Sequence, residues 1–245
     1  MSRVSVVTGG TSGIGRGIAE KILTHSGPED LVFVSYGHNR ERAEAFWEAL
    51  SEENKKKVIL LRADMSSYEE MICFAREITE RAGHVDWLVN NVGIGIYKKY
   101  EDYTFEEWTK VVNTNLSIPV FLVKELRPVM EKGGSILFTG SYAGQQAYSS
   151  SLVYGVTKAA IHFLTKSLVK EFEPKGITVN AIAPGFIQTA WHENRSPESY
   201  ERINKKIALH RFGEVSEVSD MAYAILTNGY MNGSVVDIHG GYDYF

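Results

Sequence analysis

Tyr154 and Lys158 stand four residues apart in the segment Tyr-Gly-Val-Thr-Lys, and Ser141 precedes the tyrosine by thirteen residues. If this segment is helical, the two side chains lie on one face, and the ammonium group favours the phenolate form of the tyrosine. Lowering a phenol pKa from about 10 by ~3 units takes on the order of 4 kcal/mol. The pair therefore suggests a general acid or base that works near neutral pH. Taken alone, the same spacing is more typical of a half-buried ring beside a solvated amine.

A glycine-rich segment follows the first apolar run of the chain. Residues 4–7 read Val-Ser-Val-Val and are mostly apolar and β-branched, residues 8–15 read Thr-Gly-Gly-Thr-Ser-Gly-Ile-Gly, and residues 17–23 have the apolar spacing of a helix. This pattern predicts a strand, a glycine loop and a helix. The glycines let the backbone approach a ligand, and the amides at the helix start face an anion such as a pyrophosphate. The alternative is a glycine turn that binds nothing.

The spacing Gly-x-x-x-Gly-x-Gly resembles the cofactor loop of short-chain dehydrogenase/reductases, and the resemblance covers nearly the whole chain. The segment Asn-Asn-Val-Gly at 90–93 is similar to that family's Asn-Asn-Ala-Gly turn. Pro184 and Gly185, followed by Thr189, resemble its nicotinamide-side loop. The residues that match the family's catalytic four, in order and at the family's intervals, are Asn115, Ser141, Tyr154 and Lys158.

This resemblance implies an NAD(P)-dependent oxidoreductase that transfers a hydride between a nicotinamide cofactor and a carbonyl or secondary alcohol of a small substrate. It implies that Tyr154 is the acid/base and that Ser141 holds the substrate oxygen. Lys158 would lower the tyrosine pKa and bind the nicotinamide ribose, and Asn115 would hold a water that connects Lys158 to solvent. Each residue also has a structural alternative: a serine after a strand is often a turn residue, and Asn115, or its neighbour Asn113, could only cap or distort a helix.

The resemblance also implies a set of cofactor contacts around the glycine loop, the ends of the following strands and the catalytic helix. These residues are Gly9, Thr11, Ser12, Gly13, Ile14, Gly15, Tyr36, His38, Asn39, Arg40, Asp64, Met65, Asn91, Gly93, Tyr154, Lys158, Pro184, Gly185, Ile187 and Thr189.

The end of the second strand bears on the choice of nucleotide. An acidic residue there commonly binds the adenosine ribose in NAD-preferring enzymes, whereas Tyr36 stands at this place. His38 and Arg40 could meet a 2'-phosphate, which favours NADP over NAD. Against this, Ser12 stands where NADP-preferring relatives often carry a base, and Arg40 could simply belong to the first turn of a solvated helix. Asp64 is expected either beside the adenine or as the cap of the next helix.

Strand-like runs alternate with amphipathic, helix-like stretches along the chain. This alternation predicts an α/β fold: a single-domain, doubly wound, Rossmann-like, seven-stranded parallel sheet over residues 1–245, with helices on both faces. Ligands of such folds bind at the carboxyl ends of the strands. The expected strands are 4–7, 31–35, 58–62, 87–90, 135–139, 178–183 and 235–238, and the expected helices are 15–24, 40–50, 68–81, 105–130, 151–172 and 215–226.

Size and charge narrow the class of protein. The 245 residues are 44% hydrophobic, which suits one globular domain with a large core. The first strand begins almost at the first residue, without a signal peptide or an apolar run that could span a bilayer, so we expect a cytoplasmic protein without a membrane partner. The net charge of -4 provides no basic footprint for nucleic acid, and the basic run at 55–57 is interpreted as a solvated loop.

Cysteine and histidine usage gives no indication of a metal site. Cys73 is the only cysteine, which excludes an internal disulfide, and its place in the apolar pattern of residues 71–78 predicts a small core residue. The seven histidines show none of the usual zinc spacings. No metal is therefore expected.

Substrate specificity is expected in the loops 94–97, 143–148 and 186–208. Their aromatic residues could line an apolar pocket or pack a lid over the cofactor, and residues 196–208 have the charge and helical pattern of such a lid. The aromatic residues concerned are Tyr97, Tyr148, Phe186 and Trp191.

Two other functions and an assembly state remain open. One is a 3-oxoacyl-carrier-protein reductase, although the segments 130–134 and 171–175, where a basic docking surface for an acidic carrier would lie, have mixed charges. The other is a regulator that binds NADP without turnover, which retention of both Tyr154 and Lys158 disfavours. By resemblance we expect a homotetramer or homodimer, with the aromatic tail 242–245 at a subunit contact.

Overall fold

The computed structural model describes residues 2–147 and 152–242. In these residues seven strands, all parallel, form one sheet in the order β3-β2-β1-β4-β5-β6-β7. The chain moves outward from β1 in one direction and then, from β4, in the other, so the predicted doubly wound sheet is confirmed. The strands are β1 (Val4–Val7), β2 (Leu31–Tyr36), β3 (Val58–Arg62), β4 (Val85–Asn90), β5 (Met130–Thr139), β6 (Thr178–Pro184) and β7 (Val235–Ile238).

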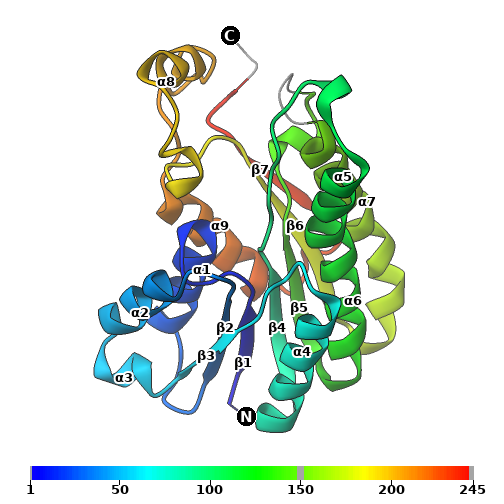
Figure 1. Ribbon diagram of the computed structural model, residues 1–245. Coiled ribbons are helices and arrows are strands. Elements are labelled where there is room, and N and C mark those ends of the chain that lie inside the picture. The colour runs from blue at the N-terminus through cyan, green and yellow to red at the C-terminus, as the bar shows by residue number, and fades with distance from the viewer. Residues whose placement is uncertain (1, 148–151, 243–245) are drawn as a thin grey trace.

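Helices cover both faces of this sheet (Figure 1). On one face lie α1 (Gly13–Thr24), α2 (Arg40–Ala49) and α9 (Val215–Thr227), and on the other lie α4 (Tyr68–Ala82), α5 (Phe105–Val112), α6 (Ile118–Leu126) and α7 (Leu152–Phe172). The short helices α3 (Glu52–Lys55) and α8 (Pro197–Asn204) lie outside these layers. Short 3₁₀ turns occupy Tyr100–Asp102, Arg127–Val129, Tyr142–Gly144, Glu173–Lys175 and Ala190–His192.

The central strands are buried because each of their faces packs against helices. Successive side chains of a strand point to opposite faces. Val6 and Leu88 accordingly join the core under α4, α6 and α7, whereas their neighbours Val7 and Val89 join the core under α1, α2 and α9. A strand covered on both sides reads as a continuous apolar run, which is why these strands could be found in the sequence.

The predicted helix over 105–130 is wrong in its middle and at its end. A π-helical turn at Asn113–Ser117 separates α5 from α6, and the helix ends in a 3₁₀ turn that contains Pro128. Met130 already belongs to β5, before the predicted start of that strand at 135. Proline breaks the helical hydrogen-bond pattern, whereas a π turn keeps nearly helical dihedrals and leaves no clear mark in apolar periodicity.

The segment between β6 and α9 carries α8 beyond the carboxyl ends of the strands, at the top of Figure 1. Ser196 caps this helix by accepting a hydrogen bond from the Ser199 amide, and Pro197 occupies its first turn. The helix predicted within 196–208 is therefore confirmed. We call residues 190–208 the lid segment.

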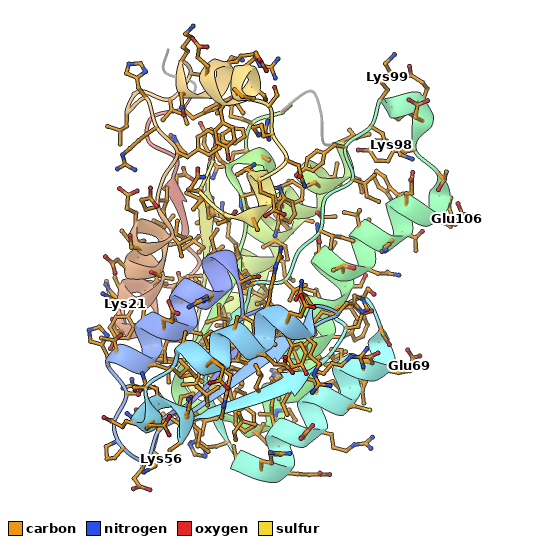
Figure 2. The ribbon with its side chains drawn as sticks, turned by 60° about the vertical axis from the view of Figure 1, so that its left-hand side comes forward. Lys21, Lys56, Glu69, Lys98, Lys99 and Glu106 are labelled. Atoms are coloured by element: carbon orange, nitrogen blue, oxygen red, sulfur yellow. The ribbon has the colours of Figure 1, made fainter. Side chains whose placement is uncertain are left out.

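Two expectations about which residues are buried are wrong. Cys73 is exposed, because Met71 and Phe74 occupy the buried face of α4 and place it on the outside. Lys57, expected in a solvated loop, is buried, and its Nζ donates to Glu53 at 2.7 Å. Lys56 lies at the amino-terminal edge of the sheet, at the opposite end of the molecule from Lys99 (Figure 2). None of the helices in the described ranges is long and apolar enough to cross a membrane.

Candidate active site

A cavity of about 1190 Å³ opens at the carboxyl edge of the sheet. Its walls come from the segments after β1, β2, β4, β5 and β6, from α7 and from the lid segment. The predicted convergence of these distant segments is confirmed. The residues expected at the site that line the cavity are Gly9, Thr11, Ser12, Gly13, Ile14, Tyr36, His38, Asn39, Asn91, Gly93, Ser141, Tyr154, Lys158, Pro184, Gly185, Ile187 and Thr189.

The glycine loop between β1 and α1 is held tightly against the segment after β4. Gly9 and Gly13 have φ values of 63° and 53°, a region that favours glycine. A Cβ at Gly15 would collide with the Gly9 carbonyl and with the Asn91 side chain, so this position has no room for a larger residue. Ser12 begins α1 without a side-chain cap, and the first turn has no acidic residue. The amides at the start of α1 are thus available to an anion in the cavity.

Ser141, Tyr154 and Lys158 meet at the floor of the cavity. Tyr154 and Lys158 lie on one face of α7, as predicted, with the Lys158 Nζ 5.5 Å from the centroid of the Tyr154 ring. The Tyr154 hydroxyl is hydrogen-bonded to the Ser141 side chain. The buried Lys158 Nζ donates to the Thr139 carbonyl at 2.6 Å. The Lys158 ammonium therefore lies between the Tyr154 ring and the end of β5, while the Tyr154 hydroxyl faces Ser141.

Burial dominates the protonation of both groups. It raises the pKa of Tyr154 to about 12, with the hydrogen bond to Ser141 opposing the shift and Tyr97 adding to it. Burial also lowers the pKa of Lys158 to about 8. Lys158 was expected to bring the pKa of the Tyr154 phenol towards neutrality, and this expectation is wrong. Desolvation disfavours the phenolate more than the protein groups around the ring favour it.

Asn115 lies behind the cavity wall in the π-helical turn, and it is buried. Its Oδ1 accepts from the Ile94 amide at 2.8 Å, and its Nδ2 donates to the Ile94 carbonyl at 2.9 Å and to Thr157 Oγ1 at 3.1 Å. A Cβ on Gly93 would lie 3.3 Å from Lys158 Nζ and 3.5 Å from Asn115 Oδ1. Asn115 thus joins the segment after β4 to α7 beside Lys158, whereas Asn113 is exposed.

Comparisons with known proteins agree on the family. Residues 9–243 match the family model described as enoyl-(acyl carrier protein) reductase. A short-chain dehydrogenase/reductase from Serratia marcescens has a similar structure, with a TM-score of 0.91 and 25% identity over 98% of each chain. The chain belongs to the short-chain dehydrogenase/reductase family. It is an NAD(P)-dependent oxidoreductase that transfers a hydride between a nicotinamide cofactor and a carbonyl or secondary alcohol of a small organic substrate.

Two further relatives are similar to this short-chain dehydrogenase/reductase over nearly their whole length. The 3-oxoacyl-acyl-carrier-protein reductase FabG of Aquifex aeolicus is 32% identical over 244 residues, which is 98% of this chain and 96% of that protein. A short chain dehydrogenase from Burkholderia cenocepacia in complex with NADP has a TM-score of 0.90 and 26% identity, covering 98% of this chain and 97% of that one.

On the cavity wall that follows β2, this short-chain dehydrogenase/reductase differs from the sequence expectation. Arg40 does not line the cavity, and its Nε donates to Glu44 at 2.7 Å on the exposed side of α2. Arg42 lines the cavity instead, with its Nη2 3.9 Å from a carboxylate oxygen of Glu193 in the lid segment. His38 lines the same wall. Asn39 caps α2 by accepting from the Arg42 amide, which sets the direction in which each arginine points.

Three other expected contacts also lie off the cavity wall. Asp64 pairs with His38 at 3.1 Å and accepts two hydrogen bonds from Ser66, while Ser67, not Asp64, caps α4. Met65 is buried in the core. Gly15 faces Gly9 and Asn91, not the cavity.

Aromatic side chains narrow the cavity above Tyr154. The Trp191 indole Nε1 donates to the Tyr97 hydroxyl at 2.7 Å, and its ring lies 5.8 Å from the Tyr154 ring. Phe186 also lines the cavity and packs against Phe212. The expected aromatic wall is therefore present, and Tyr148 and residues 243–245 of the tail lie outside the described residues.

The sequence reasoning missed His162, which lies four residues after Lys158 on α7 and so faces the same way. Its buried Nε2 accepts from the Ser141 amide at 3.4 Å, and its ring fills the space beside Gly140 and Gly144. Burial lowers its pKa to about 4, and the charge of Lys158 adds to this effect. The sequence held a signal for this: Tyr154, Lys158 and His162 follow one another at intervals of four residues, which places them on one side of a helix. Within the described ranges, no group of three or more His, Cys, Asp or Glu side chains could hold a metal ion.

We expect acid to weaken the fold through two histidines. Burial lowers the pKa of His162 and of His192 from 6.5 to about 4, so the unfolded chain binds more protons than the folded one in this range. Stability should be constant above about pH 6.5 and fall as the pH drops towards about 4, by on the order of 3 kcal/mol for each histidine. Urea unfolding at about pH 7, 5.5 and 4.5 measures the free energy directly.

His162→Gln is the informative variant, because the glutamine carbonyl still accepts from the Ser141 amide but does not titrate. Its stability should depend on pH about half as steeply as that of the wild type. An unchanged slope would contradict the assignment to His162.

Proposed function

We propose that residues 1–245 form a single domain in which Tyr154 is the acid/base and Ser141 holds the reacting oxygen of the substrate. The observation that carries the proposal is the pairing of the Tyr154 and Ser141 hydroxyls at the floor of the cavity, above a buried lysine. One sheet with a core on each face supports the single domain. Under this proposal the bound nicotinamide supplies or accepts the hydride.

The protein's own groups favour reduction of a carbonyl. Since the pKa of Tyr154 is about 12, the phenol carries its proton at neutral pH and can donate it to an alkoxide as that charge develops. Ser141 donates a hydrogen bond to the same oxygen and stabilises the charge. Lys158, whose pKa is about 8, holds the end of β5 through Thr139 and would bind the ribose next to the nicotinamide. Asn115 fixes the segment beside Lys158 and would hold the connecting water.

Tyr154→Phe should abolish turnover and leave cofactor binding nearly intact, since it removes only the hydroxyl. The measurement is oxidation of NADPH and NADH with a panel of ketones and aldehydes, together with cofactor affinity by thermal shift. Tyr230→Phe is the control, because Tyr230 is 99% exposed. An active Tyr154→Phe variant would refute the acid/base role. Cofactor binding by the wild type, without turnover of any compound, would favour the regulator.

We further propose that the preferred nucleotide is NADP. Tyr36 ends β2, so no acidic side chain at that position repels a 2'-phosphate, and His38 and Arg42 provide basic groups on the adjoining wall. The Burkholderia cenocepacia relative, whose structure contains NADP, supports the same preference. Arg42 takes the role that the sequence suggested for Arg40.

Two arginine variants test this assignment against each other. Arg42→Ala should weaken NADPH binding by about tenfold, ~1.4 kcal/mol, and change NADH binding little, because only NADPH has the 2'-phosphate. Arg40→Ala, which removes a solvated ion pair with Glu44, should leave both affinities within about twofold. Titration of NADPH and NADH by fluorescence against the wild type and the two variants gives six dissociation constants. Tighter binding of NADH than of NADPH by the wild type would contradict the preference.

A second candidate is reduction of a 3-oxoacyl group on a carrier protein, which the name of the Aquifex aeolicus relative supports. The charges at the expected docking place give less support. Arg127 lies 3.6 Å from the Glu171 carboxylate, and Lys175 donates to the backbone carbonyls of Arg127, Pro128 and Met130. Lys175 and the neighbouring Arg127 are thus engaged within the protein, which leaves Lys132 as the exposed cation of the two segments. A free small carbonyl compound therefore remains our first choice.

We also propose assembly into a homodimer or homotetramer through α7. Leu152, Val156, Ala159 and Phe163 form an exposed apolar stripe along this helix, with spacing that places them on one side. Phe163→Glu should dissociate the assembly, and Tyr230→Glu, at an exposed position elsewhere, should not. Sedimentation equilibrium measures the mass of each, and a monomeric wild type would contradict the proposal. A cytoplasmic location stays a prediction.

A further inference from the structure

Two arginines of the lid segment enter the cavity without an acidic partner. Arg195 and Arg202 both line the cavity, and their guanidinium groups share one acceptor. Arg195 Nη1 donates to Ser199 Oγ at 3.0 Å, and Arg202 Nη2 donates to the same atom at 3.5 Å. Within residues 2–147 and 152–242, neither guanidinium forms an ion pair with a carboxylate.

Arg195 is the more deeply placed of the two. Its Nε is buried and has no hydrogen-bond partner among the described residues, and its Nη2 lies 3.4 Å from His192 Nδ1. The guanidinium lies 5.6 Å from the centroid of the Phe186 ring. Two like charges that converge on one hydroxyl repel each other, and a buried donor without a partner costs free energy. An anion bound between the two guanidinium groups relieves their repulsion.

This charge lies on the substrate side of the cavity. Burial raises the pKa of Tyr97, and the hydrogen bond from Trp191 and the charge of Arg195 oppose the shift, so the field of Arg195 reaches that phenol. Trp191 joins Tyr97 to the neighbourhood of Tyr154. The start of α1, which suits a pyrophosphate, faces Thr189, since a Cβ on Gly13 would lie 3.5 Å from the Thr189 methyl group.

We propose that the substrate is an anion, a carbonyl compound or alcohol whose carboxylate or phosphate group binds Arg195 while Tyr154 acts on its reacting oxygen. A planar guanidinium binds either group through two parallel hydrogen bonds. Arg202 and Lys206, exposed on the same wall, attract the anion at the mouth of the cavity. The inference rests on the proposed function, because it requires Tyr154 to act on the same substrate whose anionic group Arg195 binds.

Matched pairs of compounds test the anion. Acetoacetate and 4-oxopentanoate are compared with their methyl esters, and dihydroxyacetone phosphate with dihydroxyacetone, so that the carboxylate and phosphate arms are separate. S-acetoacetyl pantetheine represents a neutral thioester. For the carboxylate pairs, the phosphate pair or both, the wild type should prefer the anion by about tenfold or more in kcat/KM. A neutral analogue leaves the Arg195 guanidinium unpaired, which disfavours its binding.

Arg195→Gln keeps a donor for Ser199 and removes the charge. It should lower kcat/KM for the anion by about tenfold or more and change the neutral partner by less than about twofold, and Arg195→Lys should recover part of the loss. Lys205→Gln is the matched control, because Lys205 pairs with Glu201 and does not line the cavity. The proposal is overturned if the wild type acts on an ester or on the thioester as well as, or better than, on the anions. It is also overturned if Arg195→Gln lowers kcat/KM equally for an anion and for its neutral analogue.

Failure of the proposed function is a separate result. If no compound is turned over with either nucleotide, the anion site is measured by thermal shift, with acetoacetate and inorganic phosphate as probes in the presence of NADPH. A rise in Tm for the wild type that is absent in Arg195→Gln supports the anion site, and no rise for either protein overturns it.

Discussion

The burial of a parallel sheet on both faces is the constraint on which the rest of this structure depends. Strands such as β1 and β6 are buried along their whole length, so polar groups that must meet a ligand have to follow the strand ends. All strands point the same way, which brings the segments after β1, β2, β4, β5 and β6 to one edge. Close packing of the Gly9 carbonyl and the Asn91 side chain around Gly15 then fixes the helix start that faces the cavity.

Desolvation at this edge acts on acid and base in opposite senses. It raises the pKa of Tyr154 to about 12 and lowers that of Lys158 to about 8, so burial favours the neutral form of each. The phenol therefore keeps its proton at neutral pH, and the ammonium is only weakly favoured over the amine. His162, on the next turn of α7, stays neutral for the same reason and can accept the Ser141 amide. One helix face thus sets three protonation states.

The sequence predicted what depends on pattern, and it failed where helix phase or local geometry decides. The glycine loop, Ser141, Tyr154 and Lys158 are brought together as expected, because their spacing follows from strands and a helix that apolar patterns reveal. Arg40 and Arg42 are two residues apart, about 200° around a helix, so only the start of α2 at its Asn39 cap decides which one faces the cavity. The π turn at Asn113–Ser117 has no apolar signature of its own.

Charge is distributed unevenly between this cavity and the rest of the molecule. The chain carries a net charge of -4, yet the cavity wall includes Arg42, Lys158, Arg195 and Arg202, together with the uncapped start of α1. In a concave site with low-dielectric walls, such groups act over longer distances than on an open surface. A cavity lined by these cations suits anionic ligands, and Tyr154 lines the same cavity. An anionic surface around a positive cavity also disfavours anions everywhere except at the site, which favours productive encounter over binding elsewhere.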